Sequence, residues 1–457
     1  MKILLTHGYF IADDKTEQRI MKPYPPLGLL YLSAWLKKEG YPNDIYDSTF
    51  GNLEALKSVI EKDRPEVIGI YSTLMTKTNV LKIISYIKEN PALKHTAIVI
   101  GGPDARHHAG NYLNHGVDVI IPGEGEQTLT ETIKVFEKGN TEGLSKINGI
   151  VFKSSVGVVT TTPQANHLDL DQLPFPERGK IDMDVYLGKW KTAHGYSSIN
   201  VNTMRGCPYS CNWCSKAIFG NTSRRRNPES VVKEMVLLRD QYQPDQIWFT
   251  DDVFTINRKW MREFNNLLTQ YKVLIPYECI SRSDCLDDEI LDLLKSSGCK
   301  KIWIGAESGS QKVIDLMDRR INIANTIAII NQSREKGIPT GTFIMLGYPG
   351  ETKSDIIKTA KYLKKASPDE LTIGLAYPIS GTKLFEQVEN DFSQPYNWET
   401  TTEREIVFKR TYSQRFYRFA LRYLHYISHI SKATTWKTRS IYQLKAFLLR
   451  IFLYLLN

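Results

Sequence analysis

Short apolar runs with strand character alternate with helical stretches in two separate parts of the chain. In the first 145 residues, the helical stretches at 25–40 and 53–65 end at Gly40 and Pro65. Alternation of apolar strands with helices predicts a doubly wound parallel sheet covered by helices on both faces. The predicted strands of this part lie within residues 2–9, 43–48, 66–74, 96–105 and 117–129.

A second alternating series begins near residue 195. Six strand-like runs, each followed by a helical stretch, fit within about 190 residues. This pattern predicts a partial or full parallel barrel. The predicted strands lie within residues 197–204, 246–252, 277–284, 300–310, 341–351 and 370–380.

The chain therefore divides into four predicted segments. Residues 1–145 are expected to form a Rossmann-like domain, 146–192 a short β-rich connector, 193–400 a barrel core, and 401–457 a basic amphipathic helical tail. The start, MKILLTHGYF, has no signal-peptide pattern and is typical of a first strand. Six cysteines in 457 residues are too few for a disulfide framework and indicate a reducing compartment.

Three of the cysteines are gathered in RGCPYSCNWCSKAIFG, where Cys207, Cys211 and Cys214 have C-x3-C-x2-C spacing. Structural zinc sites take four ligands, and no further cysteine follows until Cys279. A [4Fe–4S] cluster held by three thiolates instead leaves one iron open to a small molecule. A structural zinc or a coincidental grouping is the alternative. The nearby basic residues expected to face a negatively charged cluster are Arg205, Lys216, Arg224, Arg225 and Arg226.

In parallel sheets and barrels, ligands bind at the carboxyl ends of the strands. The candidate residues at these ends of the first domain are Ser72, Thr73, Gly101, Gly102, Gly123 and Glu124. Those of the second are Asp251, Asp252, Arg282, Glu307, Ser308, Gly347 and Glu351. The alternatives are that the glycines only form turns, that the aspartates cap a helix and that Glu307 forms a buried ion pair. Cys279, Cys285 and Cys299 are predicted to be buried as small apolar side chains.

The cysteine spacing, with Trp213 before the last cysteine, resembles that of the radical S-adenosylmethionine (SAM) superfamily, over roughly residues 195–385. FTDDVF, IGAESGS, FIMLGYPGET and AYPISGT strengthen the resemblance. It implies that the open iron binds the amino and carboxylate groups of SAM, and that one electron cleaves SAM to methionine and a 5′-deoxyadenosyl radical. It also implies that Asp251 and Asp252 help to hold the methionine amino group, while Glu307, Ser308 and 347–351 line the ribose and adenine pocket. Many members have Gly-Gly-Glu where this chain has Thr-Asp-Asp.

The preceding domain resembles that of the cobalamin (B12)-binding radical SAM proteins in PPLGLLYLSAWLKKEGY, GGPDA and VIIPGEGEQTL. This resemblance implies that cobalamin lies on the carboxyl edge of the first sheet and faces the cluster. The D-x-H-x-x-G pattern of ordinary cobalamin modules is absent, so we predict that no protein histidine is the lower axial ligand. His107 and His108 are predicted to lie on a surface helix. The alternative is a domain that binds no cofactor. Because no cysteine precedes Cys207, the second cluster of RNA methylthiotransferases is excluded.

The net charge of +9 resides in the last 57 residues, which hold 11 Lys+Arg and 2 Asp+Glu. Residues 414–430 have helical amphipathic spacing. The apolar run 441–456 is interrupted by Lys445 and Arg450, so it is not expected to span a membrane. Two alternatives follow: an interfacial helix on an anionic membrane, or a helix pair packed on the barrel. Nucleic-acid binding is not expected, because the stripe is too apolar.

Together these features predict a cobalamin-dependent radical SAM enzyme, similar to the anaerobic magnesium-protoporphyrin cyclase group and to class B radical methyltransferases. The expected reaction is C-methylation, or cyclisation or rearrangement, of a hydrophobic small molecule that is lipid-like or a tetrapyrrole. A flavodoxin- or ferredoxin-type protein is the expected electron donor. The expected location is the cytoplasm, with peripheral binding to the inner face of the membrane. The alternative function is a non-enzymatic iron–sulfur binding or sensor protein.

Overall fold

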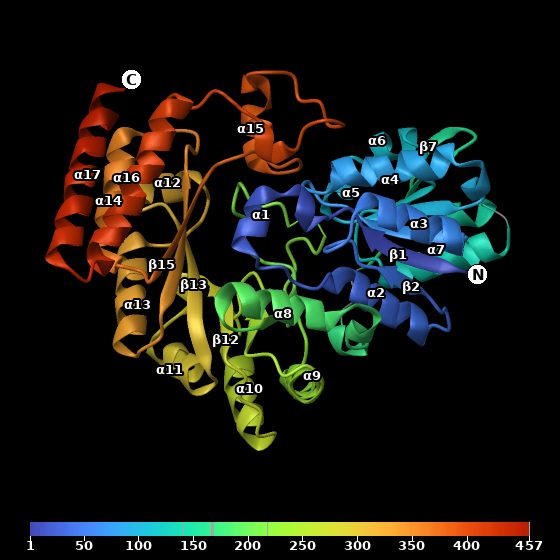
Figure 1. The fold of residues 1–457 in the computed structure, drawn as a ribbon, viewed down its shortest axis with the longest axis horizontal. Coiled ribbons are helices and arrows are strands. Elements are labelled where there is room, and N and C mark those ends of the chain that lie inside the picture. Colours follow the sequence, from blue (N-terminus) through green and yellow to red (C-terminus); the bar gives the residue numbers. More distant parts are fainter. Residues whose placement is uncertain (140, 166–168, 217, 457) are drawn as a thin grey trace.

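The computed structural model describes residues 1–139, 141–165, 169–216 and 218–456. Two α/β units lie side by side, and a pair of C-terminal helices covers the outer side of the second unit (Figure 1). Each unit contains one main sheet, and both predicted strand–helix series are confirmed.

The first unit is built on a seven-stranded sheet with the order β2-β1-β3-β4-β5-β6-β7. The first five strands in sequence are parallel, while β6 and β7 form an antiparallel hairpin at one edge. In the order 2-1-3-4-5, ligands bind near the carboxyl ends of β1 and β3, where the direction of winding reverses. The strands are β1 (Ile3–His7), β2 (Asp44–Tyr46), β3 (Val67–Tyr71), β4 (Ala97–Gly101), β5 (Val119–Ile121), β6 (Val151–Ser154) and β7 (Gly157–Thr160).

Helices cover both faces of this sheet because its strands are apolar on both sides. Along β3, Val67 packs into the core on one face, whereas Ile68 and Ile70 pack into the core on the other. This is the period of two expected for a buried parallel strand. The helices are α1 (Lys15–Ile20), α2 (Leu27–Lys38), α3 (Leu53–Asp63), α4 (Lys77–Glu89), α5 (Pro103–His107), α6 (Ala109–Asn114) and α7 (Glu126–Glu137).

The segment expected as a β-rich connector contributes to the first sheet and also contains a helix. Its hairpin, β6 and β7, extends the sheet past β5, and α8 (Met183–His194) was not predicted. The indole Nε1 of Trp190 donates to the carbonyl of Pro23 at 2.7 Å, and the hydroxyl of Tyr186 donates to Asp47 at 2.6 Å. These contacts fix α8 against the first unit.

The second unit is a six-stranded parallel sheet in which sequential strands are neighbours. Its edges are β8 and β15, so the barrel is partial. The strands are β8 (Ser198–Val201), β11 (Gln246–Phe249), β12 (Tyr277–Ser281), β13 (Cys299–Glu307), β14 (Thr340–Leu346) and β15 (Glu370–Leu375). The helices between them are α9 (Pro228–Gln241), α10 (Arg258–Gln270), α11 (Asp288–Ser296), α12 (Gln311–Leu316), α13 (Ile323–Glu335) and α14 (Lys353–Ala366).

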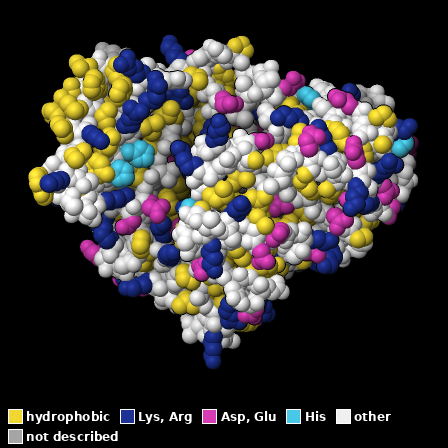
Figure 2. Space-filling model, viewed as in Figure 1, with side chains coloured by type: hydrophobic (Ala, Val, Ile, Leu, Met, Phe, Trp, Pro, Cys, Tyr) yellow, Lys and Arg dark blue, Asp and Glu magenta, His cyan; other side chains and the backbone are white. Residues whose placement is uncertain are grey.

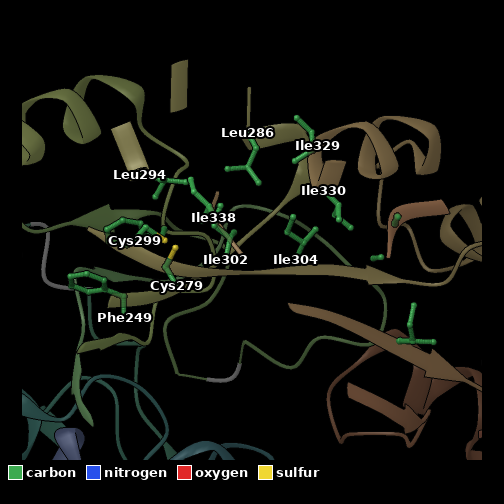
Figure 3. Packing of buried hydrophobic residues seen from close by; sticks show 14 of the residues in the cluster. Phe249, Cys279, Leu286, Leu294, Cys299, Ile302, Ile304, Ile329, Ile330 and Ile338 are labelled. Atoms are coloured by element: carbon green, nitrogen blue, oxygen red, sulfur yellow. The ribbon is translucent and has the colours of Figure 1, made fainter. Parts of the chain in front are cut away.

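The core of the second unit contains two of the cysteines outside the three-cysteine loop. Figure 3 shows Cys279 and Cys299 among Leu294 and Ile302, and both cysteines are buried. The prediction that they are small core residues is confirmed for this pair. Cys285 is only partly buried, and its sulfur lies 3.1 Å from the hydroxyl of Tyr209.

The C-terminal segment crosses back to the first unit before it forms the final helices. After α15 (Lys383–Val388), Trp398 packs into the core of the first unit, and its indole donates to Asp104 at 3.3 Å. α16 (Gln414–Lys432) then packs on α14 and β15 and contributes Phe416 and Leu424 to the barrel core. α17 (Trp436–Leu455) lies outside α16 (Figure 1). Within the described part of the chain, no helix has both the length and the apolar character needed to cross a membrane.

Candidate functional site

The carboxyl ends of the two sheets meet around one cavity of about 240 Å³. The first unit lines it with strand ends and with helix α2, while the second unit contributes Asn202 and Thr250. Ile218 and Phe219, which follow the last cysteine of the loop, also line the cavity. The predicted ligand edge of the first sheet and the cysteine loop therefore adjoin.

The glycines predicted at the first edge serve different purposes. Gly101, Gly102 and Gly123 all line the cavity. Gly102 has φ of +108°, and a Cβ there would lie 2.2 Å from the carbonyl oxygen of Ser72, so the backbone itself requires glycine. A Cβ on Gly123 would meet no atom within 4 Å, so this glycine keeps space open in the cavity.

Ser72 and Thr73 lie beside the cavity, and neither is among its lining residues. The Ser72 hydroxyl is buried and lies 2.7 Å from that of Tyr112, which in turn donates to Asp104 at 2.6 Å. The backbone N–H of Thr73 donates to the hydroxyl of Thr76 at 2.9 Å. Both residues therefore stabilise the end of β3 through hydrogen bonds without lining the cavity.

Buried ion pairs connect this edge to the cysteine loop. The guanidinium of Arg205, two residues before Cys207, donates to Glu124 at 3.2 Å and to Glu126 at 2.5 Å. The Arg205 side chain also faces the rings of Tyr31 and Phe219. Because Arg205 and both glutamates are buried, the pairing fixes the loop to the first unit.

The arginines expected to present positive charge to a cluster are instead paired with buried carboxylates. Arg224 pairs with Glu124, Arg225 with Asp251 and Arg226 with Glu234. The guanidinium of Arg225 also stacks 3.6 Å from the ring centroid of Trp260. Each of these three guanidinium groups therefore has a carboxylate partner, and β10 (Arg224–Arg225) pairs antiparallel with β9 (Met204–Arg205) at the start of the cysteine loop. That they face a cluster stays a prediction.

The three thiols of the loop lie close enough to perturb one another. Burial, the charge of Asp252 and the other two cysteines raise the pKa of Cys214 to about 12, and burial also raises that of Cys207. Cys211 and Cys214 line a second cavity of about 260 Å³. Among the described residues, no group of three or more His, Cys, Asp or Glu side chains is arranged around a single metal ion.

The loop needs glycine at position 206, where φ is +84° and a Cβ would lie 2.2 Å from the carbonyl oxygen of Thr222. Trp213, in front of the last cysteine, packs against an apolar cluster that includes Tyr348 and Leu384. The backbone of the loop is therefore held by Gly206 and by Trp213, while Cys211 and Cys214 face a cavity.

The two adjacent aspartates after β11 have different surroundings. The carboxylate of Asp251 is fully buried and accepts the backbone N–H groups of Thr203 and Met204 at 2.8 and 3.1 Å. It thereby holds the strand that enters the cysteine loop. Asp252 is exposed, and its charge raises the pKa of Cys207 and Cys214, which places it near the thiols. Neither aspartate caps a helix in the described part of the chain, and the helix that follows, α10, has Asn257 as its N-cap.

Glu307, at the end of β13, forms an ion pair with Arg319, which the sequence did not single out. The guanidinium of Arg319 lies 3.8 Å from the Glu307 carboxylate, and it donates to the Gly305 carbonyl at 3.0 Å and to the Cys211 sulfur at 3.5 Å. Burial raises the pKa of Glu307, and Arg319 opposes this shift. Arg319 therefore connects Glu307 at the end of β13 to Cys211 in the cysteine loop.

Local backbone strain accompanies these contacts. Glu307 has φ of +60°, and the residues on either side of Arg319, Asp318 and Arg320, have φ of +48° and +55°. Non-glycine residues in this region are uncommon, and they often mark functional sites. A Cβ on Gly305 would lie 2.5 Å from Arg319 Nη2 and 2.6 Å from Glu307 Oε1, so a side chain at position 305 would displace this ion pair. No periodic pattern in the sequence marks Arg319, since its role depends on a loop conformation.

Arg282 and Ser308 stabilise the loops around Glu307 and Arg319 through buried contacts. Arg282 is buried, stacks 3.6 Å from the ring centroid of Tyr209 in the cysteine loop, and donates to the Arg319 carbonyl at 2.9 Å. The Ser308 hydroxyl accepts the N–H of Ser310 at 3.2 Å and lies 3.3 Å from that of Thr359 on α14.

The loop after β14 is shaped by a buried carboxyl group. Gly347 has φ of +75°, and its N–H donates to Glu351 at 2.6 Å. Burial raises the pKa of Glu351 to about 8. A Cβ on Gly347 would lie 2.9 Å from the side chain of Arg410, so the C-terminal segment closes over this loop.

His107 and His108 do not lie on a free surface helix as predicted, because the C-terminal segment covers them. Both are half-buried. His108 lies 3.5 Å from Glu403, and a Cβ on Gly381 would collide with the His107 ring. Neither histidine is among the lining residues of the cavity between the sheets.

Comparison with known proteins identifies two domains. Residues 19–133 match the family profile described as the B12 binding domain, and residues 201–363 match that of the Radical SAM superfamily. The chain therefore carries a B12-binding domain followed by a radical SAM domain.

Similar proteins cover most of the chain. An uncharacterized methyltransferase of Pyrococcus horikoshii is 29% identical over 397 residues, which cover 84% of this chain and 83% of that protein. The anaerobic magnesium-protoporphyrin IX monomethyl ester cyclase of Rubrivivax gelatinosus is 26% identical over 420 residues, covering 88% and 73%. The cobalamin-dependent S-adenosylmethionine radical enzyme OxsB, solved with aqua-cobalamin and S-adenosylmethionine bound, has the same fold. Its TM-score is 0.76 at 15% identity, with 98% of this chain and 72% of that chain covered.

Proposed function

We propose that this chain, in which a radical SAM domain follows a B12-binding domain, is a cobalamin-dependent radical SAM enzyme that acts on an apolar small molecule. The observation that carries the proposal is the shared cavity, where the strand ends of the first sheet face the loop of three cysteines. Arg205 strengthens the argument, because its pairing with Glu124 and Glu126 holds this loop at the edge of the B12-binding domain.

Cys207, Cys211 and Cys214 would hold a [4Fe–4S] cluster. The set fits such a group, since three thiols share one loop, perturb one another and leave a cavity beside Cys211 and Cys214. When bound, a cluster with three protein ligands supplies the electron that cleaves SAM reductively. Arg319 would orient the Cys211 thiolate through its hydrogen bond to the sulfur.

The SAM contacts are assigned by position on the second sheet. Asp252, exposed beside the thiols, would bind the methionine amino group, while Asp251 would hold the loop that carries the cysteines. Glu307 and the backbone of 347–351 would bind the ribose and the adenine. Arg282 and Ser308, both buried, would position these groups from beneath.

Cobalamin would lie in the cavity between the sheets. Gly101, Gly102 and Gly123 would all border this group. A side chain at Gly123 would fill the cavity, and one at Gly102 would displace Ser72 and the adjoining Thr73. Glu124 would anchor the cysteine loop at its edge. When bound, cobalamin supplies a carrier for a methyl group. The cavity lining includes no histidine among the described residues, and the absence of a protein lower ligand stays a prediction.

An acidic electron-transfer protein of the flavodoxin or ferredoxin type would reduce the cluster. The cavity beside Cys211 and Cys214 is lined by the basic side chains of Arg106, Lys216 and Lys383. This charge complements an acidic donor, and electrostatic complementarity speeds protein association.

Two reactions are compatible with this site, and each has a similar protein: methyl transfer to carbon, and cyclisation or rearrangement. The substrate class that we propose is apolar, lipid-like or tetrapyrrole. A lipid-like substrate would be reached from the cytoplasm at the inner face of the membrane, where the enzyme would bind peripherally.

Product analysis separates these reactions. The full chain is reconstituted anaerobically with iron, sulfide and hydroxocobalamin, and is then supplied with SAM and a strong reductant. Formation of 5′-deoxyadenosine together with S-adenosylhomocysteine would support radical methyl transfer, whereas 5′-deoxyadenosine alone would support cyclisation or rearrangement. If neither product formed while the cluster stayed intact, the result would support either an iron–sulfur sensor or an enzyme that cleaves SAM only when its own substrate is bound.

Single alanine substitutions test the cluster ligands. We expect Cys207→Ala, Cys211→Ala or Cys214→Ala to remove the broad visible absorption of the reconstituted cluster, because each change deletes one of three ligands. Cys285→Ala, a partly buried cysteine outside the loop, is the matched control and should keep the absorption. Full iron content in any of the three loop variants would contradict the ligand assignment.

A further inference from the structure

The outer face of α17 is an exposed apolar surface. Of the sixteen large hydrophobic side chains that are exposed in the described part of the chain, nine belong to this one helix. Leu444, Phe447 and Leu455 are 59%, 61% and 73% exposed. Contiguous exposed apolar surface of this kind marks an interaction site.

The exposed residues form one stripe rather than a scatter. Leu444, Phe447, Leu448, Ile451 and Leu455 follow at spacings of three and four, which places them on one side of the helix. The opposite side faces α16, where Ala446 and Leu453 are buried. Phe452, which is partly exposed, stacks on Phe419 of α16. A helix that packs on a core usually has a polar outward side, whereas the outward side of α17 is apolar.

Basic residues flank the stripe, and neither α16 nor α17 contains an acidic residue. From Ile406 to the C-terminus the sequence contains no Asp or Glu. Lys445 and Arg450 lie on α17 itself, and Lys445 Nζ lies 5.3 Å from the ring centroid of Tyr426 on α16. Within the described residues, neither side chain forms an ion pair with a carboxylate. Figure 2 shows hydrophobic side chains together with Lys and Arg side chains over this region of the molecule. The remaining basic residues of the two helices are Arg415, Arg418, Arg422, Lys432, Lys437 and Arg439.

We propose that the outward face of α17 docks on an anionic phospholipid bilayer, with the apolar stripe in the acyl boundary and the flanking basic residues against the lipid phosphates. Apolar surface bordered by Lys and Arg is the composition of interfacial helices. A second copy of this chain fits the face less well, because two such surfaces would bring like charges together with no carboxylate between them. This inference rests on the proposed function, because it identifies the surface through which the enzyme would bind the membrane peripherally. The docking itself takes no part in the reaction.

Vesicle sedimentation tests the docking with the full reconstituted chain. We expect the protein to sediment with vesicles that contain phosphatidylglycerol, and to stay in solution with vesicles of phosphatidylcholine alone. The combined variant Leu444→Ser, Phe447→Ser and Ile451→Ser should lose this binding. The matched control, Val156→Ser with Val158→Ser, replaces exposed apolar residues of the β6–β7 hairpin and should bind as the unchanged protein does.

Charge is tested separately with Lys445→Gln and Arg450→Gln together. Each basic residue near an anionic surface contributes roughly a factor of five, so the pair should lower vesicle partitioning about 25-fold. High salt should weaken the binding of the unchanged protein in the same direction.

Three results would overturn the docking. The first is a chain that stays in solution with anionic vesicles. The second is a triple serine variant that sediments as well as the unchanged protein. The third is a dimer of the unchanged chain that the triple variant converts to a monomer, since a second copy would then cover the face. Formation of 5′-deoxyadenosine in the same samples reports on the reaction independently, so failure of docking and failure of the enzymatic proposal are distinguishable.

Discussion

Single buried charged groups control the loops that surround the site. Glu351 illustrates this, since one carboxylate oxygen accepts the Gly347 N–H while the other has no hydrogen-bond partner among the described residues. A buried carboxyl in this situation favours its neutral form. Arg319 differs from Glu351 in having several partners: its guanidinium contacts the Glu307 carboxylate, the Gly305 carbonyl and the Cys211 sulfur.

Glu351 predicts a pH dependence of stability. Its pKa is raised from 4.5 to about 8 in the folded chain, so between these values the folded state holds a proton that the unfolded state has lost. The stability contribution of this group is therefore present below about pH 4.5 and is lost as the pH rises to about 8, at no more than about 1.4 kcal/mol per pH unit.

We expect Glu351→Gln, which keeps the acceptor for Gly347, to raise the urea midpoint at pH 8.5 relative to the unchanged protein, and to raise it less at pH 6. Urea unfolding followed by tryptophan fluorescence measures both midpoints. The exposed Glu335→Gln is the control, with no pH-dependent difference expected. Equal midpoint shifts of the Glu351 variant at both pH values would contradict the assignment.

Arg319 predicts an effect on the reduction potential of the reconstituted cluster. A hydrogen bond to a cluster sulfur stabilises the reduced form, which carries more negative charge. Arg319→Gln should therefore lower the potential by on the order of 60 mV, which is about 1.4 kcal/mol for one electron. Potentiometric titration followed by electron paramagnetic resonance measures the shift. The neighbouring Arg320→Gln, a 70% exposed side chain, should leave the potential unchanged; an unchanged potential in the Arg319 variant would remove its proposed role.

The strand ends of the first sheet act together as one element of the site. β4 ends at Gly101 and β5 is followed by Gly123, and the two strands are neighbours, so both glycines face the same cavity. The volume of the cavity at this edge therefore depends on the absence of side chains at Gly101 and Gly123. The ion pairs of Glu124 and Glu126 with Arg205 fix the same edge to the cysteine loop.

Filling this edge should block cobalamin. We expect Gly123→Phe to lose most of the cobalamin that the unchanged chain retains after reconstitution and desalting, because the added ring would occupy the cavity. Absorbance of the retained corrin measures binding directly. Gly188→Phe on the exposed side of α8 is the matched control, since a side chain there also meets no atom within 4 Å. Equal retention by both variants would place cobalamin elsewhere.

At the scale of the whole molecule, the two units are joined by segments that are distant in sequence. The connector helix α8 is bonded to the first unit, Trp398 packs into the core of that unit, and α16 completes the core of the second. The C-terminal helices therefore differ in their contribution to stability. α16 buries seven residues, whereas α17 buries two, Ala446 and Leu453.

Truncation should separate the two helices. A chain that ends at Lys432 loses only α17, and we expect it to fold and to assemble the cluster with a modestly lower melting temperature. A chain that ends at Lys409 also loses α16, whose large buried side chains each contribute about 1.5–3 kcal/mol, so we expect it to aggregate. Circular dichroism and iron content of the two truncated proteins measure the difference. A well-folded chain without α16 would contradict its assignment to the barrel core.

The sequence by itself determined the two α/β units, the strands of both sheets and the loop of three cysteines. Hydrophobic periodicity and cysteine spacing are local properties, so the chain displays them without knowledge of its fold. The same reasoning placed Gly101, Gly102 and Gly123 at a carboxyl edge, where they line the cavity.

Only the tertiary structure decided which charged groups meet. Arg205 pairs with Glu124 and Glu126 some 80 positions earlier, and His108 lies against Glu403, 295 positions later. No local pattern encodes such partners, because they depend on how the two units and the C-terminal segment pack together. For the same reason the arginines that follow the cysteine loop are paired rather than free, and α16 is part of the core, whereas α17 keeps an apolar face exposed.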